Sequence, residues 1–171
     1  MVDDADIRKL STLLDLSQTL GSTLNLKTSL ARVLEILEEH HGTVSGAITL
    51  LDRETGELNI EAATGITWQV SRKAKYKLGE GITGRVVESG RPVIVPRVSR
   101  EPLFLNRTGV WKETGKDEMS FFCIPVIVDG KTAGTLGVIF HFAHKPSSNW
   151  LICSGDGSRP CKALGRLRWV R

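Results

Sequence analysis

Residues 76–96 read YKLGEGITGRVVESGRPVIVP, and glycines punctuate this stretch between two short apolar segments. Its first residues alternate apolar and charged side chains, which predicts a half-exposed strand ahead of the glycines. We expect a helix of roughly two turns next, because Gly90 stands where a left-handed residue would end it and Pro92 follows. The β-branched residues 93–95 then predict a second short strand, which Pro96 closes.

Gly79, Gly81 and Gly84 spell G-x-G-x-x-G, the fingerprint that cradles phosphates in dinucleotide-binding folds. That fingerprint needs a continuously apolar strand before it and a long helix after it. Here the preceding residues 72–78 are RKAKYKL, and Gly90 ends the helix early. The context therefore argues against nucleotide binding, and we interpret the glycines as a turn between strand and helix.

Residues 79–93 follow the pattern G-x-G-x-x-G-x-V-x-x-x-G-x-P-V, which resembles the central signature of the GAF domain, a small-molecule sensing module of signalling proteins. The stretches 98–108 (VSREPLFLNRT) and 118–126 (EMSFFCIPV) are similar to the amino-terminal GAF domain of the NifA-type transcriptional activators of nitrogen-fixation operons. The resemblance covers about residues 8–140. It implies an α+β fold, related to PAS domains, with a regulatory role.

Two amphipathic helices are predicted at the amino terminus. Apolar residues at 7, 10, 13, 14 and 20 have helical spacing, and Gly21 ends the first helix. Asn25 is a suitable N-cap for a second helix that carries an apolar stripe from Leu30 to Leu37 and stops at Gly42. Both stripes could be intramolecular core, or the first could form a homodimer seam with a second copy of the protein.

The rest of the domain predicts strands. Residues 44–51 and 58–63 read as a hairpin, and residues 119–128 and 132–140 read as another around the turn at 129–130. Residues 65–71 are expected to be a connector, and the basic cluster Arg72, Lys73, Lys75 and Lys77 either a charged edge strand or a surface for an acidic partner.

This order predicts an antiparallel central sheet of five to six strands. The two N-terminal helices are expected on one face of it. A short helix and the irregular segment 97–117, here called the lid, are expected to cover a pocket on the other face.

Composition places the chain among globular proteins, since 40% of its residues are hydrophobic and 25% are charged. No apolar run approaches the ~20 residues that cross a membrane, and no targeting segment precedes the first helix, so we expect a cytoplasmic protein. Residues 145–171 hold six basic residues and one acidic residue. Their net charge is therefore +5. Since the whole chain has a net charge of +4, residues 1–144 have a net charge of −1. The domain itself thus lacks the basic surface of a nucleic-acid-binding module.

Residues 1–142 are expected to form the GAF domain and residues 143–171 an irregular basic tail. Trp150 to Arg171 has neither helical nor strand periodicity, so the tail is interpreted as non-native, for instance translated from a shifted frame. A metal site at Cys153 and Cys161 is the functional alternative. Seven residues separate these cysteines without a paired histidine, which disfavours it.

Catalysis has little support in the sequence. The four histidines have no serine or cysteine nucleophile beside them in a motif, and Cys123 lies inside an apolar strand. No Walker-type GK[ST] occurs, so we expect neither an enzyme nor a resident cofactor or metal.

A binding site has better support. The lid carries Arg97, Arg100, Asn106 and Arg107, a set suited to a small anion, unless these arginines only pair with Glu101, Glu113 or Glu118. Thr49, Thr83 and Ser120 are candidate pocket hydroxyls. The resemblance implies 2-oxoglutarate, PII-type signalling proteins or a NifL-type antiactivator as effectors.

Three functions remain open at this point. The first is a ligand-sensing GAF domain of a NifA-like, sigma-factor-dependent activator, here without its ATPase and DNA-binding modules. The second is a protein-interaction module with a vestigial pocket. The third is a methionine-sulfoxide reductase on the same scaffold. This last function needs several cysteines around the pocket, where the sequence offers Cys123 alone.

Overall fold

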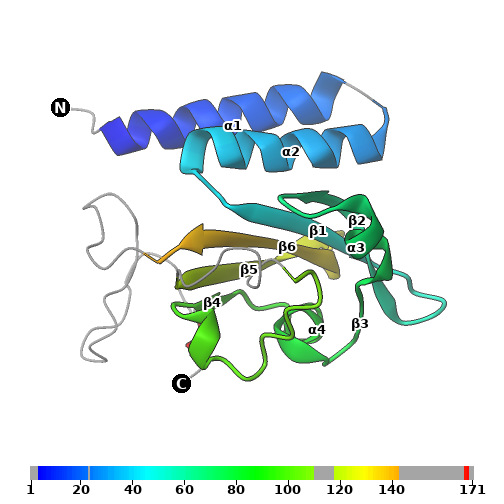
Figure 1. The fold of residues 1–171 in the computed structure, drawn as a ribbon. Helices are drawn as coiled ribbons and strands as arrows, with labels where there is room; N and C mark the ends of the chain where they lie inside the picture. Colours follow the sequence, from blue (N-terminus) through cyan, green and yellow to red (C-terminus); the bar gives the residue numbers. More distant parts are fainter. Residues whose placement is uncertain (1–3, 23, 110–117, 143–167, 170–171) are drawn as a thin grey trace.

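The computed structural model describes residues 4–22, 24–109, 118–142 and 168–169. Two helices lie above a central sheet, and a short helix and loops lie below it (Figure 1). The elements in chain order are α1 (Asp4–Ser22), α2 (Leu26–His41), β1 (Ser45–Leu51), β2 (Glu57–Thr64), α3 (Trp68–Lys73), β3 (Lys75–Lys77), α4 (Gly81–Ser89), β4 (Val93–Val95), the 3₁₀ turn η1 (Val98–Arg100), β5 (Met119–Val128), β6 (Lys131–His141) and β7 (Arg168–Trp169).

The sheet has the strand order β3-β2-β1-β6-β5-β4-β7. Strands β1 to β6 pair antiparallel, and the two-residue β7 pairs parallel with β4. The predicted α+β architecture with an antiparallel sheet of five to six strands is therefore confirmed by β1 to β6, and β7 adds a seventh strand that the sequence did not predict. Both hairpins also form where the sequence predicts them, at residues 52–56 and 129–130.

Helix α2 covers the β1–β2 half of one sheet face. Its Leu34, only 1% exposed, packs on Ile48 and Ala62. The helix starts and stops at the predicted residues: the Asn25 side chain accepts a hydrogen bond from the Thr28 N–H at 3.2 Å, and Gly42 is left-handed with φ 65°. Both ends of α2 therefore lie where the sequence predicted them.

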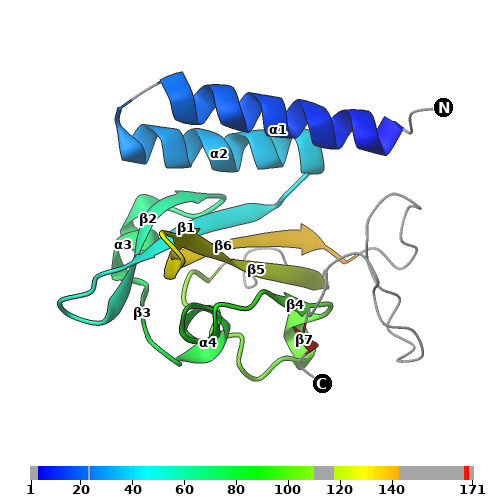
Figure 2. The ribbon, with the colours of Figure 1, turned by 180° about the vertical axis from the view of Figure 1, so that it is seen from behind.

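Helix α1 lies on α2, on the side away from the sheet (Figures 1 and 2). It buries Ala5 and Thr12, whereas five of its six large apolar side chains are exposed: Ile7, Leu10, Leu13, Leu14 and Leu20; the sixth, Leu16, is partly buried. Of the two alternatives left open for the first helix, the structure therefore does not show its apolar stripe as intramolecular core. Its inner face is small and polar, because α2 meets it with the two histidines His40 and His41.

The opposite sheet face packs on α4 and the lid. The core there is formed by apolar residues of α4, β4, η1, β5 and β6, among them Ile82, Val86, Met119 and Ile139. Helix α4 approaches the preceding turn closely: a Cβ at Gly84 would lie 2.1 Å from the Lys77 carbonyl oxygen. As predicted, α4 ends at the left-handed Gly90, whose N–H bonds the Val86 carbonyl.

One predicted connector is partly helical. Residues 65–71 were expected to be irregular, but α3 begins within them and takes up Arg72 and Lys73. Six residues are too few to show helical periodicity in a sequence. The edge strand predicted from the basic cluster is therefore only β3, which pairs with Glu57–Asn59 of β2. Within the described ranges, no helix is both long and apolar enough to span a membrane.

Candidate functional site

A small cavity of about 60 Å³ lies between the sheet, α4 and the lid. Its wall is uncharged and mainly apolar. It is lined by Ser45, Gly46, Ala47, Thr49, Ile60, Ile66, Tyr76, Ile82, Thr83, Leu103, Phe104, Leu105, Asn106, Thr108, Phe121, Thr135, Gly137 and Ile139. This volume holds a few water molecules and falls well below the ~300–1,000 Å³ of typical ligand sites. A metabolite would therefore require the lid to move.

Hydroxyl groups meet at the floor of the cavity. The Thr49 and Thr135 oxygens lie 2.6 Å apart on paired residues of β1 and β6, and both side chains are buried. Thr135 and Thr83 are also hydrogen-bonded to the Cys123 thiol, so the network reaches from β1 across the sheet to α4. A buried polar group without a partner is costly, and these groups satisfy one another.

The described part of the lid, residues 97–109, is held over the cavity by apolar contacts. A Cβ at Gly81 would lie 2.8 Å from Leu105 Cδ1, so the glycine allows the lid to sit against the start of α4. The ring of Phe104 packs edge-on against Phe121, with centroids 5.1 Å apart. Asn106 adopts a left-handed φ of 42°, a conformation that asparagine tolerates better than most residues.

Arg107 fastens the rim of the cavity. Its guanidinium donates to the Lys75 carbonyl oxygen and to the Glu80 carboxylate, and it lies over the Tyr76 ring, 5.2 Å from the centroid. These contacts tie the lid to β3 and to the start of α4. We refer to Arg107, Glu80 and the Lys75 carbonyl as the clasp.

Local hydrogen bonding and burial shift two pKa values at this rim. The pKa of Glu80 is lowered, first by the hydrogen bond from the Lys77 N–H and then by Arg107. Burial raises the pKa of Tyr76, and the Arg107 charge opposes that rise. At neutral pH the clasp therefore pairs a carboxylate with a guanidinium beside a neutral phenol.

A family model of the GAF domain matches residues 23–149. The chain belongs to the GAF domain family. The predicted family is thereby confirmed, and the cavity described above lies in this GAF domain.

The relatives of this GAF domain are regulators of nitrogen fixation. The chain is 35% identical over 125 residues to the nitrogen fixation protein VnfA of Azotobacter vinelandii, covering 72% of this chain and 24% of that protein. It is 31% identical over 148 residues to the Nif-specific regulatory protein of Herbaspirillum seropedicae, covering 86% and 27%. The chain thus spans about a quarter of the length of these relatives.

Solved GAF domains share the fold. The A. aeolicus Nlh2 GAF domain, solved in an inactive state, superposes with a TM-score of 0.72 at 24% identity, covering 81% of this chain and 83% of that one. Free methionine-R-sulfoxide reductase from Neisseria meningitidis, solved with its substrate, has a TM-score of 0.66 at 20% identity, covering 85% and 80%. At these identities the likeness concerns the fold alone.

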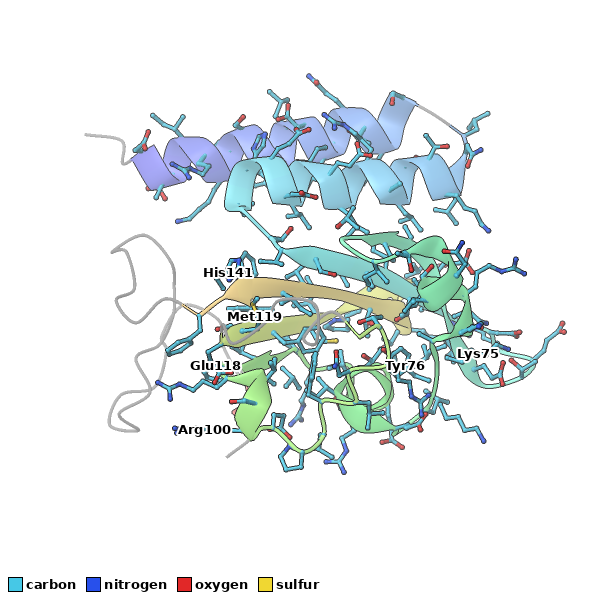
Figure 3. All side chains as sticks on the ribbon, in the orientation of Figure 1. Lys75, Tyr76, Arg100, Glu118, Met119 and His141 are labelled. Carbon is cyan, nitrogen blue, oxygen red and sulfur yellow. The ribbon has the colours of Figure 1, made fainter. Side chains whose placement is uncertain are left out.

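Three of the predicted site residues line the cavity of the GAF domain: Thr49, Thr83 and Asn106. The other four lie elsewhere among the described residues. Arg107 belongs to the clasp, and Ser120 donates to the Pro96 carbonyl at 2.7 Å. Arg97 stacks on the Phe142 ring at 4.5 Å, and Arg100 is exposed. In Figure 3, Arg100 lies far from Tyr76 at the cavity rim.

The motif glycines of the GAF domain shape its backbone. Gly79, Gly81 and Gly90 have positive φ, and Gly84 permits the close approach of α4 to the Lys77 carbonyl.

The arginines that the sequence predicted as one anion-binding set in the lid contact different parts of the domain. The partner of Arg107 is Glu80, whereas the sequence suggested Glu101, Glu113 or Glu118 as partners of the lid arginines, of which Glu113 lies outside the described residues. Glu118 instead accepts two hydrogen bonds from Ser99.

Sequence reasoning missed several cavity residues, notably Ser45, Tyr76, Phe121 and Thr135. For two of them a signal existed. Ser45 and Thr49 are four residues apart on β1, as Thr135 and Ile139 are on β6, so each pair shares one face of its strand, and that face can be read from the strand period of two. Tyr76 and Phe121 offered no such signal, because their placement depends on how the lid folds over the sheet.

The described residues give this GAF domain little chemistry. Burial raises the pKa of Cys123 to about 12, so its thiol stays protonated and is a poor nucleophile at neutral pH. No group of three or more metal-ligating side chains occurs in the described ranges. Cys153 and Cys161, and most of the tail interpreted as non-native, lie outside the described residues; Arg168–Trp169 is the part of the tail that is described, and it forms β7 beside β4.

Proposed function

We propose that this GAF domain is the effector-sensing regulatory domain of a nitrogen-fixation activator and that its effector is 2-oxoglutarate. One observation carries the proposal: a cavity roofed by a lid that a single guanidinium fastens at the rim. A partly covered cavity beneath a segment that an ion pair holds in place suits a ligand-dependent change of state. The kinship with Nif-specific regulators supports the choice of nitrogen and carbon status as the signal.

Arg107 would recognise the dicarboxylate. The cavity wall carries no charged side chain, so the carboxylates of the ligand need a cation at the rim, and Arg107 is next to the cavity residues Tyr76 and Asn106. Guanidinium groups bind carboxylates with two parallel hydrogen bonds. In this proposal 2-oxoglutarate displaces Glu80 from Arg107, and the clasp opens as the ligand enters.

A thermal-shift titration of the whole chain with 2-oxoglutarate tests the proposal. Ligand at a hundred times its dissociation constant adds about 2.7 kcal/mol to the free energy of unfolding. Arg107→Ala should abolish the shift, and Arg100→Ala, an exposed arginine away from the cavity, is the matched control and should keep it. Glu80→Gln should strengthen binding, because it removes the charge that competes for Arg107. No shift in the wild-type chain would rule out 2-oxoglutarate as the effector.

The second candidate is a protein-interaction domain without an effector. The small volume of the cavity and the internally satisfied Thr49–Thr135 pair favour it, because neither requires a ligand. The partner would then be a PII-type or NifL-type regulatory protein. This candidate predicts that 2-oxoglutarate leaves the melting temperature unchanged while such a partner binds in a calorimetric titration.

Dimerisation through the N-terminal helices is the other part of the proposal. The exposed apolar side chains of α1 support it. Neither membrane association nor direct binding of nucleic acid by this domain is part of the proposed function.

A further inference from the structure

Four side chains at the cavity floor form one hydrogen-bond network, here called the floor network: Thr49, Thr135, Cys123 and Thr83. The Thr49 and Thr135 oxygens lie 2.6 Å apart, and the Cys123 thiol is hydrogen-bonded to both Thr135 and Thr83. Thr49, Thr135 and Cys123 are only 3%, 1% and 0% exposed. Within the described ranges, none of the four side chains makes a hydrogen bond outside this network.

Every member of the floor network has a partner, yet the network holds one hydrogen more than its bonds use. Each hydroxyl and the thiol carries one hydrogen, so four hydrogens serve three hydrogen bonds. Whichever way the bonds run, one hydrogen has no acceptor within the network. The thiol is the weakest donor and holds this spare hydrogen at the least cost. An acceptor atom in the cavity would take a hydrogen bond from a hydroxyl group and leave all four hydrogens bonded.

Thr49 is the member of the floor network best placed to donate to an occupant. It lines the cavity and stands at one end of the network, with Thr135 as its single partner. Thr135 already has two partners, and Cys123 does not line the cavity. Thr83 forms the other end, but it is half-buried and therefore depends less on an occupant than the buried Thr49 does.

The cavity wall suits a keto group better than an amino group. Among the described residues, no charged side chain lines the cavity. The carboxylate at the rim, Glu80, already accepts hydrogen bonds from Arg107 and from the Lys77 N–H. A protonated amine brings only donors, and burying its charge without an anionic partner is costly. A keto oxygen brings only acceptor lone pairs, which match the spare hydrogen of the floor network.

We propose that Thr49 recognises the occupant by donating a hydrogen bond to its keto oxygen, so that the cavity selects an oxo acid over the amino acid with the same carbon skeleton. The inference deepens the proposed function and rests on it. For 2-oxoglutarate, Arg107 takes a carboxylate at the rim and Thr49 takes the keto oxygen at the floor. Selectivity is thereby assigned to a residue of β1, in addition to the arginine of the lid.

Calorimetric titration of the whole chain with three five-carbon dicarboxylates tests the inference. 2-Oxoglutarate carries a keto group where L-glutamate carries an ammonium group, and glutarate carries neither. The wild-type chain should bind glutarate about tenfold more weakly than 2-oxoglutarate, which is the effect of one hydrogen bond. It should not bind L-glutamate measurably. This comparison needs no variant, so it does not depend on how a substituted chain folds.

Variants of Thr49 then test the residue itself. Thr49→Val keeps the shape of the side chain and removes its hydroxyl, so it should bind 2-oxoglutarate as weakly as the wild-type chain binds glutarate. Its affinity for glutarate should be unchanged. Thr49→Ser retains a hydroxyl and should keep the preference for 2-oxoglutarate. Ser120→Ala removes a hydroxyl that bonds the Pro96 carbonyl outside the cavity, and as the control it should keep the preference too. Circular dichroism establishes that each variant is folded.

The possible failures can be told apart. Equal binding of 2-oxoglutarate and glutarate by the wild-type chain would overturn the inference and leave the proposed function standing, as would binding of L-glutamate as tight as that of 2-oxoglutarate. A preference for 2-oxoglutarate that persists in Thr49→Val would overturn the role of Thr49. A wild-type chain that binds none of the three compounds would overturn the proposed effector and this inference with it.

Discussion

The two faces of the sheet are built differently. Toward α2, Leu34 fills the space above Ile48 and Ala62, and the contact is apolar and close. Toward α4 and the lid, the same strands present Thr49 and Thr135 to a cavity. Apolar packing is the simplest way to stabilise a sheet, so a face that keeps space and polar groups departs from the demands of folding alone. The comparison supports the proposed effector site on the lid side, whereas the α2 side contributes apolar packing.

Truncating the α2 side should have the largest effect. Leu34→Ala removes a side chain that is 1% exposed and should cost about 2–5 kcal/mol in the free energy of unfolding, measured with urea. Ile127→Ala, 57% exposed on β5, is the control and should stay within about 0.5 kcal/mol of wild type. Equal losses of unfolding free energy in Leu34→Ala and Ile127→Ala would contradict the view that the α2 side of the sheet stabilises the fold by close apolar packing.

The lid side should be sensitive where its backbone packs closely. In Gly84→Ala the new Cβ meets the Lys77 carbonyl oxygen, so we expect a loss of about 1–3 kcal/mol in thermal or urea unfolding. Gly21→Ala offers the opposite case, since nothing lies within 4 Å of its Cβ position in α1. There alanine should stabilise the helix by up to about 1 kcal/mol. A neutral Gly84→Ala would show that α4 can shift, and the cavity with it.

The threonine pair sharpens the contrast on the cavity floor. Thr49→Val or Thr135→Val alone leaves the other hydroxyl without this partner and should cost about 1–2 kcal/mol. The double variant should cost less than the two single losses together, because both polar groups are then gone. Additive losses in a double-mutant cycle would mean that the two hydroxyls act independently.

The α1–α2 contact should depend weakly on pH. Burial lowers the pKa of His41, with the nearby charges of His40 and Arg8 acting in the same direction. A histidine whose folded pKa is below the unfolded value of about 6.5 contributes stability that is present above pH 6.5 and is lost as pH falls. Unfolding free energies at pH 7.5 and pH 5.5 should therefore differ less in His41→Gln than in wild type. An equal difference in the two chains would contradict this assignment to His41.

Local signals predicted most of the fold. Helix α2 begins after Asn25 and ends at Gly42, and α4 ends at Gly90, as the sequence predicted. The strand periods also located both hairpins. What failed depended on tertiary contacts. The outward leucines of α1 follow from how Thr12 meets the two histidines of α2, which no spacing within α1 reveals.

The candidate site was predicted less well than the fold. Thr49, Thr83 and Asn106 were found because the strand, the short helix and the lid that carry them are visible in the sequence. The arginines were grouped by proximity along the chain, yet Arg97 and Arg107 bond to different neighbours, Phe142 and Glu80. Loop side chains choose their partners after the lid has folded, and sequence order does not record that choice.

Calorimetric titration of the whole chain with 2-oxoglutarate, compared with an Ala47→Leu variant, tests the central claim most directly. Ala47 lines the cavity on β1, and a leucine there would occupy the space proposed for the effector. The account predicts saturable binding to the wild-type chain and none to the variant, with both chains folded by circular dichroism. Equal binding by the two chains, or no binding by the wild-type chain, would contradict it.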